Sequence, residues 1–184
     1  MYHKTKILAI LILSGISSSF LPLALYAQSG VIVSEGNFKV LMPEDYLSTI
    51  DTISTEIGPV MYHTLHARDS FMTYQISFCD YPEGTVHSDS ADLLKEFFQS
   101  TIEESVASVH GTKKYESEIT QFGYPGWFWK IEFGKNKFLK TKAFVAGNRF
   151  YSLIVAGDLR KDDDLRTFAF LDSFQFLELS RVRK

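Results

Sequence analysis

Two histidines close together in the sequence are the first residues whose spacing could serve chemistry. His63 and His66 stand three residues apart, which would place both imidazoles on one side of a helix. The surrounding residues 60–67 are rich in β-favouring types, and on a strand this spacing sends the two rings to opposite faces. We therefore expect no metal ion shared by this pair. His87 and His110 flank a predicted helix, and we expect them to lie in solvent.

Cys79 is the single cysteine of the chain and its candidate nucleophile. A reactive thiol needs a nearby base and a lowered pKa, and the sequence identifies no base for Cys79. We interpret Cys79 as a small apolar filler at the end of a strand. With one cysteine no internal disulfide can form, so the stability has to come from the hydrophobic core.

Motifs of the common enzyme classes are absent from the sequence. There is no Gly-x-Ser-x-Gly elbow, phosphate loop, dinucleotide fingerprint or zinc-protease helix. The acidic residues are scattered, and no pair of them can be assigned to the acid and base roles of glycoside hydrolysis. We predict that the protein is not an enzyme, and we assign no catalytic residue, no cofactor and no metal site.

Three consecutive aspartates, Asp162, Asp163 and Asp164, could form a cation site. They could equally begin a helix, because carboxylates there accept hydrogen bonds from free backbone amides and face the positive end of the helix dipole. Leu165 and Phe168 follow with helical spacing. We favour the helix start.

An aromatic run over residues 122–129 is the most unusual local feature. It could form a stacking platform for a sugar or a peptide. It could also be a tight turn that enters a core strand, and the alternation of Trp127, Trp129, Ile131 and Phe133 is typical of that second structure. We favour the core strand.

The elements that must position these residues are mostly strands. One helix is predicted at residues 90–110, where apolar residues recur at spacings of three and four, and Gly111 is expected to supply its left-handed exit. The segment 44–57 is predicted to be a loop with a short helical turn. Strands are predicted at residues 31–33, 38–42, 60–67, 71–78, 127–133, 138–146, 149–156 and 174–177.

The pairing of the last long strands can be predicted from the turns between them. Gly147 and Asn148 form a two-residue turn of the mirror type, which puts Ala143 opposite Ser152. In the preceding hairpin we predict that Trp129 lies opposite Ala143, where a large indole has small neighbours.

One face of these paired strands is both apolar and basic. The predicted pairing gathers on it Phe128, Phe144, Tyr151, Leu153 and Val155, beside Lys130, Lys140 and Lys142. A face with this much apolar area requires a cover. Either the C-terminal helix covers it through Leu165, Phe168 and Leu171, or a partner does, and we favour the helix.

The first 27 residues have the layout of a secretory signal peptide. Lys4 and Lys6 give a basic start, residues 7–27 carry no charge, and Ala27 is a small residue at a plausible cleavage point. The alternative is a membrane anchor, but serines, a glycine and a proline interrupt the apolar run and no basic cluster follows it. We expect cleavage after Ala27, which leaves residues 28–184 as one exported domain without a stable membrane span. We expect it in the periplasm or outside a bacterial cell.

The charge of residues 28–184 restricts the classes of partner. These residues contain 17 Lys and Arg against 22 Asp and Glu, which gives a net charge of −5. A mildly acidic surface argues against binding to nucleic acid or to anionic membranes. The basic end at residues 181–184 is too short to reverse this balance.

Three segments together carry a likeness to known proteins: residues 38–43, the Tyr-Pro-Gly of residues 124–126 before an aromatic strand, and residues 148–157 with the later 173–176. On these segments the chain resembles the PsbP-like superfamily, which includes extrinsic photosystem proteins, Mog-type proteins and exported bacterial domains of unknown role. The resemblance implies an α+β fold, a central antiparallel sheet with helices packed on both faces. It also implies a binding or assembly role without established catalysis. No segment matches the photosystem proteins' basic docking arm or a metal set.

These observations predict an exported, non-catalytic binding or assembly-accessory domain of the cell envelope, whose partner is an envelope protein. One alternative is a carrier of a small apolar ligand, held in a pocket between the sheet and the helices. A second alternative is a hydrolase whose site is assembled from distant residues. A closed apolar cavity would favour the carrier, and a convergent cluster of His, Asp or Ser would favour the hydrolase.

Overall fold

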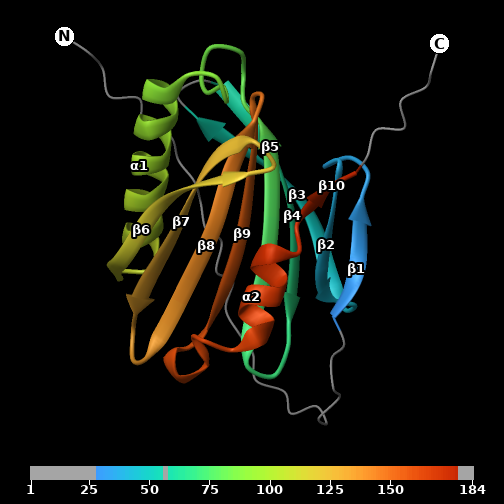
Figure 1. Cartoon of the computed structure of the whole chain (residues 1–184), viewed down its shortest axis with the longest axis vertical. Coiled ribbons are helices and arrows are strands. Elements are labelled where there is room, and N and C mark those ends of the chain that lie inside the picture. Colours follow the sequence, from blue (N-terminus) through green and yellow to red (C-terminus); the bar gives the residue numbers. More distant parts are fainter. Residues whose placement is uncertain (1–27, 56–57, 178–184) are drawn as a thin grey trace.

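The computed structural model describes residues 28–55 and 58–177, and the predicted signal peptide at residues 1–27 lies outside them. The described chain forms two antiparallel sheets, one of seven strands in the order β3-β4-β5-β9-β8-β7-β6 and one of three in the order β1-β2-β10 (Figure 1). The strands are β1 Gln28–Val33, β2 Phe38–Pro43, β3 Tyr46–Thr55, β4 Gly58–Arg68, β5 Met72–Asp80, β6 Thr112–Gln121, β7 Tyr124–Phe133, β8 Lys137–Ala146, β9 Arg149–Asp158 and β10 Gln175–Phe176. The helices are α1 Ala91–Ser108, the 3-10 turn Leu159–Lys161 and α2 Leu165–Asp172.

The seven-stranded sheet has a separate hydrophobic core on each face. α1 packs on one face, where Leu94, Phe98 and Ile102 are buried with Trp129 and Ile131 of β7. The opposite core combines residues of the small sheet with the buried side of α2. The α+β fold with a central antiparallel sheet is therefore present. The finer expectation of helices packed on both faces is not supported, because the three-stranded sheet makes up much of the second cover (Figure 1).

The β1–β2 hairpin is fixed to the large sheet by aromatic and polar contacts. The Phe38 ring meets Phe78 edge-on, with 5.7 Å between ring centroids. The Tyr151 hydroxyl donates to the carbonyl oxygen of Gly36 at 2.9 Å. Arg149 donates to the Glu35 carbonyl oxygen at 2.9 Å while its guanidinium also pairs with Asp80. These contacts hold the β1–β2 hairpin against β5 and β9, which are distant from it in the sequence.

Both edge strands of the seven-stranded sheet differ from what the sequence predicts. The predicted loop at residues 44–57 is wrong, because most of it forms β3. β6 has no counterpart among the predicted strands. An edge strand lies in solvent on much of both faces, so it carries polar residues where a central strand alternates. Because β3 and β6 lack this alternation of apolar and polar residues, the sequence predicts neither strand.

The hairpin predictions are confirmed at one turn and wrong at the other. Ala143 lies opposite Ser152, as the turn at Gly147 predicts. Trp129, however, lies opposite Thr141, and Trp127 takes the place beside Ala143. The β7–β8 turn is tighter than predicted, because Gly134 and Asn136 adopt positive φ angles of 52° and 59° and close it within three residues. A shift of two residues keeps every side chain on its predicted face.

α1 agrees with the predicted helix except at its end. His110, with a φ of 49°, makes the left-handed exit that we expected of Gly111. Gly111 is required for space instead, since a Cβ there would lie 2.4 Å from Cγ2 of Ile131. The chain that leaves the helix therefore lies tightly against β7.

Gly126→Ala is expected to lower the free energy of unfolding by about 1–3 kcal/mol, the usual cost of overpacking a core. An added Cβ would lie 2.3 Å from the carbonyl oxygen of Ala143 and 2.7 Å from Cβ of Phe144, which are rigid neighbours. Gly30→Ala is the matched control, because a Cβ there meets nothing within 4 Å. Urea unfolding of both variants checks this prediction, and equal midpoints would contradict it.

Candidate functional site

The structure separates the histidines that the sequence brings together. His63 stacks on Phe78, with 4.6 Å between ring centroids, and its Nδ1 lies 3.6 Å from a Glu35 carboxylate oxygen. His66 is paired with Gln75 of β5 and lies on the other face, where burial and then Arg68 lower its pKa. His87 is half-exposed beside Asp89. Within residues 28–55 and 58–177, no three His, Cys, Asp or Glu side chains are grouped to hold a metal ion.

Cys79 is buried against two tyrosines in the core beneath α1. The hydroxyl oxygens of Tyr62 and Tyr81 lie 2.7 Å apart beside it. Burial raises the pKa of the Cys79 thiol to about 12, although hydrogen bonds from both tyrosines oppose the rise. A thiol with so high a pKa is a poor nucleophile at neutral pH, which supports the interpretation as a core filler.

Cys79 is therefore expected to react with a maleimide slowly in the folded protein. At pH 8 a pKa near 12 lowers the thiolate fraction by roughly three orders of magnitude relative to an ordinary thiol. Labelling followed by mass spectrometry, with and without urea, checks this. Equal labelling rates in the two conditions would show that the thiol is accessible and ionised in the native state.

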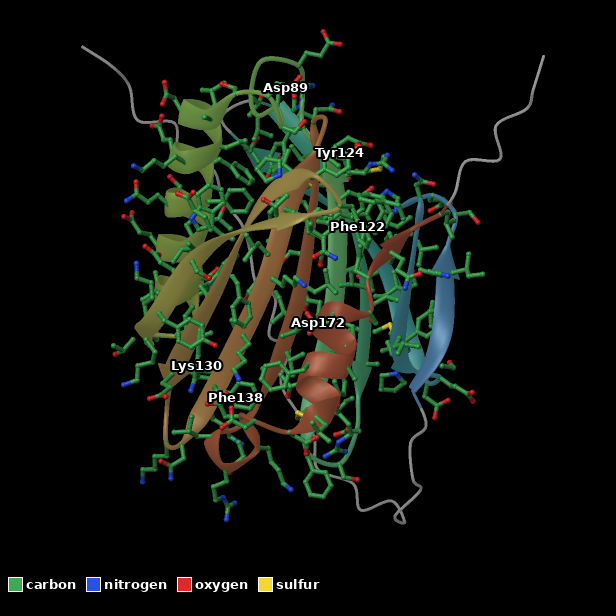
Figure 2. All side chains as sticks on the ribbon, in the orientation of Figure 1. Asp89, Phe122, Tyr124, Lys130, Phe138 and Asp172 are labelled. Carbon is green, nitrogen blue, oxygen red and sulfur yellow. The ribbon has the colours of Figure 1, made fainter. Side chains whose placement is uncertain are left out.

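The aspartates at residues 162–164 are occupied by protein cations. Asp164 precedes α2 and accepts a hydrogen bond from the backbone N–H of Arg166 at 3.0 Å, which confirms the helix start. Asp162 forms ion pairs with Lys130 and Lys140. Figure 2 shows Lys130 toward the end of the sheet where β9 turns into α2. These pairs fix the 3-10 turn and the start of α2 on the sheet.

The aromatic run at residues 122–129 is used inside the fold. Phe122 and Gly123 form the β6–β7 turn with positive φ angles, and Trp129 is fully buried. Trp127 stacks on Phe98 of α1 with 4.3 Å between centroids. Tyr124 meets Phe176 of β10 at 5.5 Å, in the region that Figure 2 labels with Phe122 and Tyr124. The prediction of a turn entering a core strand is confirmed.

The apolar and basic face of β7–β9 is covered by α2 as predicted, and the expected Leu171 takes part together with Phe170. Phe144 and Leu153 share a core with Phe170 and Leu171 of α2. One of the three expected helix contacts is wrong, since Leu165 is 83% exposed. Phe168 is 39% exposed, but it contacts the basic part of this face, where Nζ of Lys140 lies 4.8 Å from its ring centroid. The helix begins at Leu165, and its buried stripe consists of Thr167, Phe170 and Leu171.

Within the described part of the chain, two buried polar atoms beneath α1 have no hydrogen-bond partner. They are Nε1 of Trp129 and Oγ1 of Thr141, on residues that lie directly opposite each other on β7 and β8. A buried polar group without a partner costs free energy. An apolar ligand at this place would leave both atoms unpaired, so the pair does not suit a hydrocarbon cargo.

Thr141→Val is expected to raise the free energy of unfolding by about 1 kcal/mol, because it removes an unpaired buried hydroxyl with little change in shape. Thr167→Val is the matched control and is expected to destabilise, since the Thr167 hydroxyl donates to the sulfur of Met72 at 3.2 Å. Chemical denaturation of the two variants measures both signs. A loss of stability in Thr141→Val would show that this hydroxyl does have a partner in solution.

Four of the exposed large apolar side chains of the seven-stranded sheet lie at the β3 edge, whereas Tyr115 of β6 is 41% exposed at the other edge. Tyr46, Leu47 and Ile50 of β3 and Met61 of β4 are 39%, 70%, 58% and 56% exposed. We call these four residues, with the free side of β3, the β3 edge surface. The sequence does not predict this surface, because residues 44–57 lack the alternation of a half-buried strand and are predicted to form a loop. Its signal is a run of Ile, Thr and Ser with a single charged residue, which is typical of a strand.

Acidic groups border the β3 edge surface. Glu44 and Asp45 precede β3, and Asp51 lies within it; all three are exposed. In the part of the chain that the structure describes, none of these three carboxylates has an ion-pair partner. The surface therefore combines apolar side chains with unpaired negative charge.

Taken together, these features define an α+β protein built on a long antiparallel sheet, with a candidate docking edge and no assembled reactive group among the described residues. No protein-family model and no curated protein matches the chain. Solved structures do match, among them the solution structure of cyanobacterial PsbP (CyanoP) from Synechocystis sp. PCC 6803. That match has a TM-score of 0.54 and 9% sequence identity, and it covers 86% of this chain and 98% of that chain. The chain has a PsbP-like fold, and an identity this low establishes the fold alone.

Proposed function

We propose that this protein is an exported, non-catalytic accessory domain that binds a partner protein in the bacterial cell envelope. Residues 1–27 act as a cleaved signal peptide, and residues 28–184 form the working domain in the periplasm or outside the cell. The PsbP-like fold is compatible with an accessory role. No helix within the described residues is long and apolar enough to cross a bilayer.

The β3 edge surface is the observation that carries this proposal. Four large apolar side chains exposed at one edge of a sheet are unfavourable in water and favour aggregation unless a partner covers them. The neighbouring unpaired carboxylates add a charge that a partner of opposite sign would recognise. Binding explains both features, whereas catalysis explains neither.

The two alternatives have less support. A carrier of an apolar ligand conflicts with the unpaired atoms of Trp129 and Thr141 beneath α1. A hydrolase would need a reactive group, and Cys79 is buried with a raised pKa while His63 and His66 lie on opposite faces. The exposed edge favours neither of them.

Two measurements on the full chain in its own cells test the proposal. Mass spectrometry of the envelope fraction is expected to find a chain that begins at Gln28, and a chain that retains Met1 in the cytosol would overturn export.

Chemical crosslinking in living cells is expected to give one discrete adduct with an envelope protein, which reciprocal tagging of that protein also recovers. A chain that stays uncrosslinked across several reagent lengths would overturn partner binding.

A further inference from the structure

We propose that the β3 edge binds an extended segment of the partner as an added strand, and that this segment carries apolar and basic side chains. This inference rests on the proposed function and specifies its binding mode. The occupant is a stretch of about eight to ten residues, because a ten-residue strand is about 33 Å long. The following observations carry the inference.

β3 presents a long and regular row of free backbone groups. Its pairing with β4 runs without a shift from Tyr46 opposite Ala67 to Thr55 opposite Gly58. It is the terminal strand of the seven-stranded sheet. In an antiparallel ladder every second residue turns its N–H and C=O away from the neighbouring strand. Among the residues that the structure describes, one side of β3 pairs with no strand, so it is available to hydrogen-bond another strand along its length.

The other edge of the same sheet is protected in ways that β3 is not. β6 carries four charged residues, Lys113, Lys114, Glu116 and Glu118, and its register shifts between Lys113 and Tyr115. Charges and bulges are the usual means by which proteins block pairing at a sheet edge. β3 has one charged residue, Asp51, and no register shift. The sheet is thus protected at one edge and open at the other.

The side chains of β3 suit an added strand better than a flat docking surface. Ile50 lies opposite His63, on the same face as Tyr46 and Met61, whereas Leu47 lies on the reverse face. A globular partner placed on one face would leave the other face exposed. The alternating side chains of an added strand cover apolar groups on both faces at once.

The charge of the edge identifies the chemistry of the occupant and disfavours a second copy. Glu44, Asp45 and Asp51 give three negative charges that form no ion pair with any described residue, so Lys or Arg on the added segment would meet them. Asp51 lies near the middle of β3. Two copies paired antiparallel about a two-fold axis would bring both Asp51 carboxylates close together, and like charges at that spacing are destabilising.

Site-directed photocrosslinking in living cells tests the location and the occupant. A photoreactive residue replaces Ser48 on β3 in the full chain, and the matched control replaces Ser117 on β6, which is also exposed. We expect an adduct from position 48 alone, on a partner peptide that interleaves apolar residues with Lys or Arg. An adduct with a second copy of this chain, or with an acidic peptide, would overturn the inference.

The same experiment separates failure of this inference from failure of the proposed function. A partner captured by general chemical crosslinking, or from position 117, but never from position 48, would overturn the β3 edge and leave partner binding intact. Capture from no position and with no reagent would overturn both proposals.

A synthetic copy of the crosslinked segment then tests the binding mode. Addition of a strand is expected to slow hydrogen exchange of β3 backbone amides by about tenfold or more at saturation. The double variant Ser48→Lys and Thr52→Lys is expected to raise the Kd about tenfold, and Ser117→Lys with Thr120→Lys is expected to change it less than about twofold. Binding that leaves the β3 amides unprotected, or that is equally sensitive to both double variants, would overturn strand addition.

Discussion

Asp162→Ala is expected to lower the free energy of unfolding by about 3 kcal/mol, because it leaves a buried ammonium group without its carboxylate. The side chain of Lys140 is 3% exposed, and its Nζ lies 2.5 Å from Oδ1 of Asp162. Lys130, also largely buried, pairs with the other oxygen of the same carboxylate. One substitution therefore removes the carboxylate that two lysines share on the sheet face covered by α2.

Asp163→Ala is the matched control for this prediction. Asp163 is the next residue and its carboxylate lies 3.8 Å from the same Nζ of Lys140, but its side chain is 92% exposed. Solvent screens an exposed pair, so the expected loss is below about 0.5 kcal/mol. Guanidinium unfolding of both variants measures the difference. Equal losses in the two variants would show that burial does not govern the strength of this cluster.

The acid dependence of stability gives a second measurement of the same cluster. Burial alone would raise the pKa of Asp162, but hydrogen bonds from Lys130 and Lys140 outweigh it and hold the pKa below its ordinary value. A carboxylate with a depressed folded pKa stabilises the fold above its unfolded pKa, near 4, and loses that contribution as the pH falls through the folded pKa. Asp162→Ala should therefore flatten the fall in stability below about pH 4 relative to the parent protein.

Local periodicity explains why much of the fold could be predicted from the sequence. The alternation in β5 and the spacing of three and four in α1 each reflect one buried face, so the residues themselves record it. The Gly147-Asn148 turn fixes the register of the β8–β9 hairpin, because a two-residue turn determines which residues of the two strands lie opposite each other. The face shared by Phe144 and Lys140 followed from these elements without knowledge of the tertiary structure.

The candidate site could not be predicted because it depends on which strand has no neighbour. Tyr46, Leu47 and Ile50 do not alternate as a half-buried strand does, and nothing local to them says that β3 ends the sheet. The predicted β7–β8 register is wrong because a local feature of its turn could not be read from the sequence. Its turn length depends on the left-handed conformation of Asn136, a residue that also occurs in longer loops.

Phe174→Ala is expected to lower the free energy of unfolding by about 3–5 kcal/mol, the largest loss among these predictions. The Phe174 ring is 1% exposed and lies where the two sheets meet. It stacks on Phe38 of the small sheet at 5.2 Å and meets Phe144 and Tyr151 of the large sheet at 4.8 and 5.3 Å. Its removal leaves a cavity and ends aromatic contacts on both sides, two costs that add.

The position of Phe174 makes this variant a test of how the small sheet is held. Phe71→Ala removes the same ring from a residue that is 51% exposed at the β4–β5 turn, and its expected cost is below about 1 kcal/mol. Denaturant unfolding followed by tryptophan fluorescence compares the two variants. If Phe174→Ala costs no more than Phe71→Ala, the Phe174 ring does not hold the small sheet, and the Phe38 ring contacts and the hydrogen bonds of Arg149 and Tyr151 suffice. The larger loss is expected because those are single hydrogen bonds, each of which contributes about 1 kcal/mol net, whereas the ring fills space that neither sheet can close by itself.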